Sequence, residues 1–106
     1  MNQHVYETAA AGAIAYTFAP GKSVHIREVR LHLSAVGGAA EAFTMKSDSA
    51  LGAAYDIQHA SQDMNALTDY VFRPTNGFLF LAKGDELDFA WANSNNRTWG
   101  LEILFS

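Results

Sequence analysis

The sequence predicts an all-β protein, an antiparallel, jelly-roll-like β-sandwich of about eight strands in a single domain. Three observations predict it. Residues 83–106 contain two runs in which apolar side chains alternate with small or polar ones, as in strands that bury one face. Shorter runs of this kind recur along the chain, with turns at fairly regular spacing. No stretch shows the convincing 3.6-residue periodicity of an amphipathic helix.

The expected strands outside the long segment 24–33 are short. They span residues 14–18, 40–46, 55–60, 69–73 and 77–82, and the terminal pair follows within residues 83–106. Residues 47–69 are the least periodic part of the chain. Within them, residues 61–67 have a second interpretation, a turn or two of helix capped by Ser61.

Residues 24–33 form the longest expected strand, and its apolar register slips in the middle. Val24 and Ile26 share one register, and the apolar residues from Val29 onward share the other, so the slip falls at Arg27 and Glu28. One extra residue opposite a partner strand would restore the buried face. The slip therefore predicts a β-bulge or bend, of the kind found where one strand passes between two sheets.

Residues 1–12 are polar and alanine-rich, which separates them from the sandwich domain expected in residues 13–106. We interpret them as a flexible N-terminal arm that orders against a neighbouring subunit, or as a frayed terminus. The alanine-rich residues 9–15 lack a preceding basic region and are interrupted by Gly12. We therefore expect neither a signal peptide nor a membrane span.

Composition argues against several partners. The formal net charge is −4, and the seven Lys and Arg residues are scattered, so no nucleic-acid groove is expected. The chain has no cysteine, which removes disulfides and thiolate ligands. A domain of 106 residues buries only roughly 65% of its unfolded surface, and oligomerisation often supplements such limited stability.

The four histidines raise the hypothesis of a metal site, since neutral imidazoles bind transition metals in cupin-type barrels. They lie at positions 4, 25, 32 and 59, without a His-x-His pair. His25, Arg30 and His32 are expected on the polar face of one long strand. We interpret the histidines as surface or interface residues, and we expect no metal, no cofactor and no catalytic constellation.

The aromatic residues of the terminal pair raise the hypothesis of a sugar-stacking platform. Trp91 and Trp99 share their alternation face with Leu87 and Leu101, which favours core packing. The polar loop between the two strands is the better candidate for binding a partner, and otherwise is a solvated hairpin loop. Its residues are Asn93, Ser94, Asn95, Asn96 and Arg97.

Four segments of the chain resemble small jelly-roll proteins of tailed bacteriophage virions. They are Tyr-Val-Phe-Arg-Pro at 70–74, Lys-Gly-Asp-Glu-Leu at 83–87, Asn-Ser-Asn at 93–95 and Thr-Trp-Gly-Leu-Glu-Ile at 98–103. In such proteins a Gly-Asp turn leads into a hydrophobic strand, an asparagine-rich loop follows, and an aromatic-rich strand closes the sheet. The resemblance covers roughly the second half of the chain and, more loosely, residues 24–34.

The resemblance implies a non-enzymatic capsid decoration or cement protein in a virion assembled in the host cytoplasm. It implies the major capsid protein as partner and a homo-oligomer, with a trimer as the expected state. Two alternatives stay open: a carbohydrate- or receptor-binding module of a phage tail or fibre, and a cupin-like metalloprotein that uses His25, His32 or His59.

Overall fold

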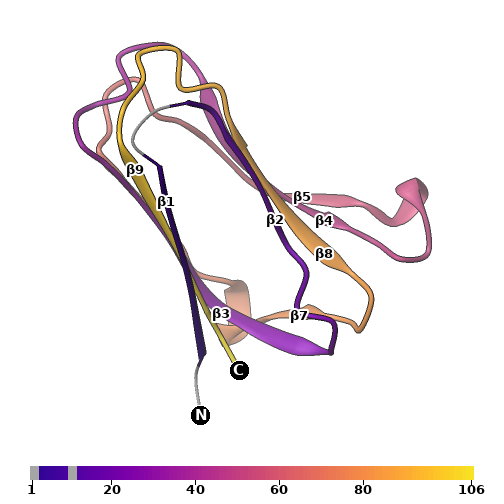
Figure 1. The fold of residues 1–106 in the computed structure, drawn as a ribbon. Coiled ribbons are helices and arrows are strands. Elements are labelled where there is room, and N and C mark those ends of the chain that lie inside the picture. The colour runs from indigo at the N-terminus through magenta and orange to yellow at the C-terminus, as the bar shows by residue number, and fades with distance from the viewer. Residues whose placement is uncertain (1–2, 10–11) are drawn as a thin grey trace.

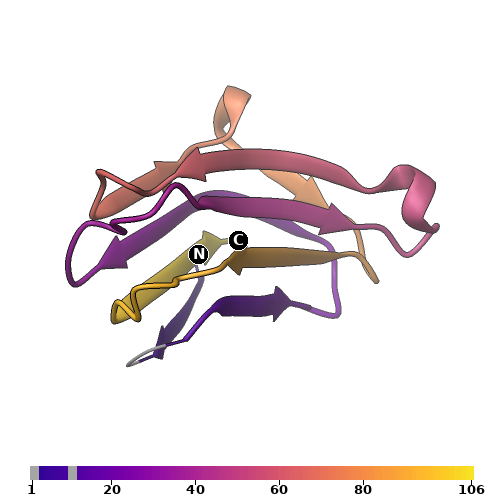
Figure 2. The ribbon, with the colours of Figure 1, turned by 90° about the horizontal axis from the view of Figure 1, so that it is seen from above.

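The structure is a computed structural model that describes the backbone of residues 3–9 and all atoms of residues 12–106. The described residues form two antiparallel sheets that face each other (Figures 1 and 2). Their strands are β1 (Gln3–Ala9), β2 (Ile14–Phe18), β3 (Val24–Leu33), β4 (Ala42–Asp48), β5 (Ile57–Asp63), β6 (Asp69–Phe72), β7 (Leu79–Leu81), β8 (Glu86–Trp91) and β9 (Trp99–Phe105). Two short 3₁₀ helices, η1 (Ala53–Tyr55) and η2 (Thr75–Gly77), lie in the connections.

The strand order is that of a jelly roll. One sheet has the order β1-β9-β3-β6, with β7 also paired to β3, and the other has the order β2-β8-β4-β5. Strand β7 pairs with residues 24–26 of β3, and β6 pairs with residues 29–32. The two short strands therefore follow one another along β3 and together fill one strand position. Two sheets of four strand positions each confirm the predicted fold class.

The predicted bulge in β3 is present. Ile26 pairs with Phe105 of β9 and Glu28 pairs with Leu104, so Arg27 is the extra residue. Residues on both sides of the bulge bury their apolar face, as the sequence required. The bulge does not carry the strand from one sheet to the other, because β3 pairs with β9 on both sides of it.

The terminal strands do not form a hairpin, which corrects the sequence analysis. Strand β8 pairs with β2 and β4, whereas β9 pairs with β1 and β3 in the opposite sheet. Side-chain alternation shows that a strand buries one face, but it does not show in which of two facing sheets the strand lies. The connection 92–98 crosses the roughly 10 Å between sheets instead of turning back.

The N-terminal segment also differs from the sequence analysis. The backbone of residues 3–9, expected in a flexible arm, forms β1 and pairs antiparallel with β9 over its whole length. An unpaired β9 would leave a row of backbone donors and acceptors exposed at the sheet edge, and β1 satisfies them. The other residues of the expected arm are Gly12, which is described, and residues 1–2 and 10–11, which lie outside the described residues.

The helical interpretation of residues 61–67 is wrong. Ser61 lies in β5 opposite Thr44, and a turn follows β5. In the described part of the chain no helix is long and apolar enough to cross a membrane.

The core fills the space between the two sheets with hydrophobic side chains. Nearly every inward position of β3, β8 and β9 is buried, and Phe43, Met45 and Met64 join them from the β4 side. Within residues 12–106, Asn93 is the buried polar residue. The interior between the sheets is therefore a packed apolar core.

Candidate partner-binding surfaces

Asn93, predicted to belong to an exposed partner loop, is a buried structural residue. The residue is 2% exposed. Its Nδ2 donates to the carbonyl oxygens of Gly12 (2.7 Å) and Arg97 (2.9 Å), and its Oδ1 accepts from the Arg97 backbone N–H (2.8 Å). The amide thereby ties the start of β2 to the connection between β8 and β9.

The other residues of the 93–97 loop bind a neighbouring turn of the same chain. Asn95 Nδ2 donates to the Gly37 carbonyl at 2.9 Å, and Arg97 Nε donates to the Val36 carbonyl at 2.8 Å. The Ser94 backbone N–H and hydroxyl both donate to the Glu41 carboxylate. The loop is thus fixed against residues 36–41, and Ser94, Asn95 and Asn96 still present exposed surface.

Both tryptophans lie in the core, as the alternation predicted. Trp91 and Trp99 are buried, and Trp99 Nε1 donates to the Gly12 carbonyl at 3.3 Å. Neither indole forms an exposed platform on which a sugar ring could stack.

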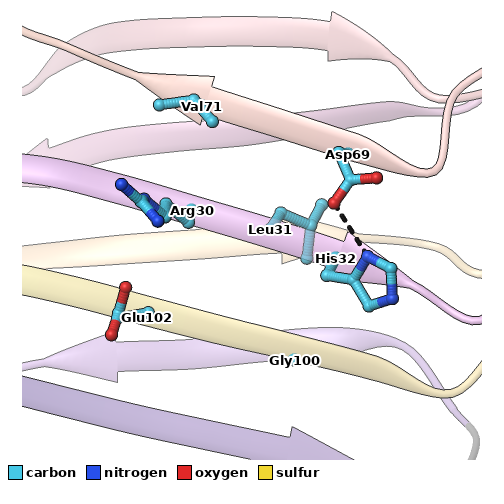
Figure 3. Close-up of a pocket in the computed structure, with 7 residues that line it drawn as sticks. All are labelled: Arg30, Leu31, His32, Asp69, Val71, Gly100 and Glu102. Atoms are coloured by element: carbon cyan, nitrogen blue, oxygen red, sulfur yellow. Dashed lines mark hydrogen bonds and ion pairs between the residues drawn. The ribbon is translucent and has the colours of Figure 1, made fainter.

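The outer face of β3 carries the polar residues expected there, and His32 and Asp69 form a close pair (Figure 3). His32 Nδ1 lies 2.7 Å from Asp69 Oδ1, and the Thr68 hydroxyl donates to Asp69 Oδ2 at 2.7 Å. The Thr68 hydroxyl, followed by His32, lowers the pKa of Asp69. Asp69 therefore stays ionised and can orient the His32 ring.

A shallow hollow of about 320 Å³ lies on this face. Gly100 of β9 sits opposite His32 and contributes no side chain, which leaves space beside the ring. The hollow is lined by Arg30, Leu31, His32, Asp69, Val71, Gly100 and Glu102 (Figure 3). This lining offers hydrogen-bond donors and acceptors of both charges to a small polar group.

Next to the hollow, Glu28 joins two arginines. Its carboxylate oxygens lie 2.7 Å from Arg73 Nε and 2.5 Å from Arg30 Nε. The hydrogen bond from Arg73 is the main cause of the lowered pKa of Glu28, and Arg30 adds to it. This ion-pair group joins β3 to the segment after β6.

The structure does not bring His25, His32 and His59 together. His25 and His32 lie on β3, whereas His59 lies on β5 of the other sheet and contacts the Ser47 hydroxyl at 3.1 Å. Burial lowers the pKa of His59. Among the described residues, no three His, Cys, Asp or Glu side chains form a group suited to a metal ion.

An exposed apolar loop between β4 and β5 was not predicted from the sequence, and together with the first residue of β5 we call it the β4–β5 tip (residues 49–57). It projects beyond the sheets on one side of the molecule (Figures 1 and 2). Leu51, Tyr55 and Ile57 are 77%, 60% and 57% exposed. Three large apolar residues in an aperiodic segment of otherwise small or polar residues were the available signal, because such residues lack a place in a strand's buried stripe.

The β4–β5 tip is held by hydrogen bonds. Asp56 Oδ1 accepts from the Ser49 N–H at 2.8 Å, and Asp85 Oδ1 accepts from the Ala50 N–H at 2.9 Å. The Ser49 hydroxyl accepts from the Leu51 N–H at 3.1 Å. These bonds fix the backbone of the loop while its apolar side chains remain in solvent.

A second exposed apolar surface lies beside β7, and we call it the aromatic face (His25, Arg27, Phe78 and Phe80). The His25 ring lies 4.6 Å from the Phe78 ring and 5.8 Å from the Phe80 ring, measured between centroids. The Arg27 guanidinium lies 5.6 Å from the Phe78 centroid, within cation–π range. Phe78 and Phe80 are nevertheless 43% and 55% exposed.

Comparison with known proteins finds similarity to solved structures. No protein-family model and no curated protein matches this sequence. Among solved structures, a chain in a structure of infectious bursal disease virus, Gx strain, is similar with a TM-score of 0.39 and 13% sequence identity. The similarity covers 97% of this chain and 32% of that chain, so this chain spans about a third of that chain's length.

Proposed function

We propose that this chain is a non-enzymatic structural protein of a bacteriophage virion, a capsid decoration or cement subunit. It binds the major capsid protein, forms a homo-oligomer, and is located in the virion after assembly in the host cytoplasm. The resemblance of residues 70–74, 83–87, 93–95 and 98–103 to small jelly-roll proteins of phage virions supports this proposal. In the fold these segments are β6, the turn before β8, the start of the connection 92–98, and β9.

The observation that carries the proposal is the distribution of apolar side chains on the jelly roll. Hydrophobic residues fill the space between the sheets, and further large apolar side chains stand on the outside, at the β4–β5 tip and the aromatic face. Exposed apolar groups on a hydrogen-bonded loop are typical of surfaces that a neighbouring protein covers. Viral capsid proteins are among the proteins built on jelly rolls.

A second candidate is a carbohydrate- or receptor-binding module of a phage tail or fibre. The hollow beside His32 favours it, because its volume of about 320 Å³ and its mixed polar lining suit a small polar ligand. A glycan-array screen tests this candidate with Arg30→Ala as the comparison variant. Binding that the variant loses supports it, and an array without binding contradicts it.

Sedimentation with capsid shells tests the leading proposal. Purified protein is mixed with shells that lack it, and the bound fraction and the temperature of shell disruption are measured. We expect saturable binding at micromolar protein and a higher disruption temperature. Shells that already carry the protein serve as the control and take up no more. Absence of binding to the undecorated shells at micromolar protein contradicts the capsid role.

A further inference from the structure

The β4–β5 tip combines apolar side chains with negative charge. From residue 47 to residue 72 the chain contains no Lys or Arg. Asp56 lies within the tip, Asp48 at the end of β4 pairs with Glu86 of β8, and Asp85 bonds the tip backbone. His59, the histidine of this region, has a lowered pKa and is neutral at pH 7. The tip thus presents Leu51, Tyr55 and Ile57 together with one carboxylate of its own, and three more lie at its base.

The aromatic face combines apolar side chains with positive charge. The Arg27 guanidinium donates to the Ser106 hydroxyl and the Gly77 carbonyl, so its charge meets neutral acceptors. Arg73 and Arg30 both bond Glu28 beside this face, and Arg30 also lies opposite Glu102 of β9, so the positive charge of the aromatic face comes from Arg27. Lys22 and Lys83 flank this end of the sheet, where the Lys83 N–H donates to the Ser23 hydroxyl next to Lys22.

These two surfaces complement each other in polarity and charge, and they lie on different strands of the two sheets. A contact between two tips would bring like charges together, which is unfavourable. An acidic apolar tip against a basic aromatic face buries apolar groups and pairs opposite charges. In a single copy both surfaces are exposed at once, so each copy can use its tip toward one neighbour and its face toward another.

We propose that copies of this chain associate head to tail, with the β4–β5 tip of one copy packed on the aromatic face of the next. Leu51 and Tyr55 pack against Phe78 and Phe80, and the carboxylates around the tip lie near Arg27. A heterologous contact of this kind closes into a ring or extends as a filament. This contact adds a self-association mode to the proposed structural role, and it depends on that role only for what the assembly does in the virion.

Sedimentation velocity with two complementary variants tests this contact. The tip variant is Leu51→Ser with Tyr55→Ser, and the face variant is Phe78→Ser with Phe80→Ser. We expect the wild-type protein to associate and each variant alone to be monomeric, with Kd raised at least about tenfold. An equimolar mixture of the two variants retains one intact tip and one intact face, so it forms heterodimers and nothing larger.

The control replaces two exposed apolar residues elsewhere, Val36→Ser with Leu67→Ser, and it associates like the wild type. Circular dichroism checks that each variant is folded. If a double variant does not fold, the single variant Leu51→Ser replaces the tip variant, and Phe80→Ser replaces the face variant. A monomeric wild type at about 100 μM, a tip variant that still self-associates, or a mixture without heterodimers overturns the inference. This experiment contains no capsid shells. The head-to-tail contact can therefore be disproved while the proposed binding to capsid shells stands.

Discussion

Asn93 shows how one side chain joins distant parts of this fold. An asparagine in a run of asparagines resembles a solvated turn residue, yet this one is buried and bonds Gly12 and Arg97. Its backbone φ of 51° lies in the left-handed region, which asparagine tolerates better than most residues. Nothing in the local sequence separates Asn93 from Asn96, because the difference arises from packing against the start of β2.

Replacing Asn93 with alanine should therefore destabilise the protein strongly. The substitution removes the three hydrogen bonds of the buried Asn93 amide, leaves the Gly12 carbonyl only its bond from Trp99 Nε1, and keeps a left-handed backbone. We therefore expect a loss of about 2–4 kcal/mol in the free energy of unfolding. Urea denaturation measures it. Asn96→Ala is the matched control, since Asn96 has a φ of 53° and is exposed. Equal losses in the two variants would contradict the role assigned to the Asn93 amide.

His59 should make stability depend on mildly acidic pH. Its pKa is lowered by burial from an ordinary value of 6.5, so the unfolded chain binds a proton more readily than the folded one. The stability that neutral His59 contributes is therefore fully present above pH 6.5, and it is lost as the pH falls below that value. Glu28 and Asp69 also have lowered pKa values, but their contributions to stability are lost only as the pH falls below their ordinary values of 4.5 and 3.8.

His59→Gln retains a hydrogen-bonding group toward Ser47 and removes the titration. We expect the melting temperature of the variant to fall less than that of the wild type between about pH 6.5 and pH 5. Differential scanning fluorimetry across this range makes the comparison. If the melting temperatures of both proteins fall equally with pH, His59 does not cause the loss of stability.

At the scale of the strands, side-chain alternation predicted most of the structure. It located β2, β3, β4, β8 and β9 closely and the bulge in β3, because each of these strands buries one apolar stripe. It missed β1, where polar residues dominate and edge pairing with β9 is the organising interaction. It joined β8 and β9 in one hairpin because alternation carries no information about which sheet receives a strand.

The bulge at Arg27 gives a prediction at this scale. Deleting Arg27 removes the extra residue, so Val24 and Ile26 must turn outward or lose their pairing with β7 and β9. Exposing two buried aliphatic side chains should cost at least about 3 kcal/mol of unfolding free energy, measured by urea denaturation. Arg27→Ala keeps the residue count and should cost less than about 1.5 kcal/mol. A deletion no worse than this substitution would contradict the bulge.

The candidate surfaces show what sequence patterns leave undetermined. The outer polar face of β3 was predicted, since Arg30 and His32 alternate with buried leucines. The pairing of His32 with Asp69 depends on the register between β3 and β6, which periodicity does not give. The β4–β5 tip and the aromatic face depend on where two aperiodic connections end in space, so they emerged only from the folded chain.

The molecule as a whole combines an apolar interior with exposed apolar groups at separate places on its outside. Its formal net charge of −4 is unevenly spread, with acidic groups around the β4–β5 tip and arginines beside the aromatic face. Such a domain suits repeated attachment, because a rigid sandwich presents the same surfaces in every copy. The proposed virion role uses this property directly.

Copy number in the virion is the decisive measurement. Under the proposed role, virions are purified by density gradient from lysates in which the chain is expressed, and its amount is measured by quantitative mass spectrometry relative to the major capsid protein. We expect the chain in a fixed ratio to the capsid protein that salt washing preserves. Its absence from purified virions, in lysates where it is expressed, would contradict the proposed structural role.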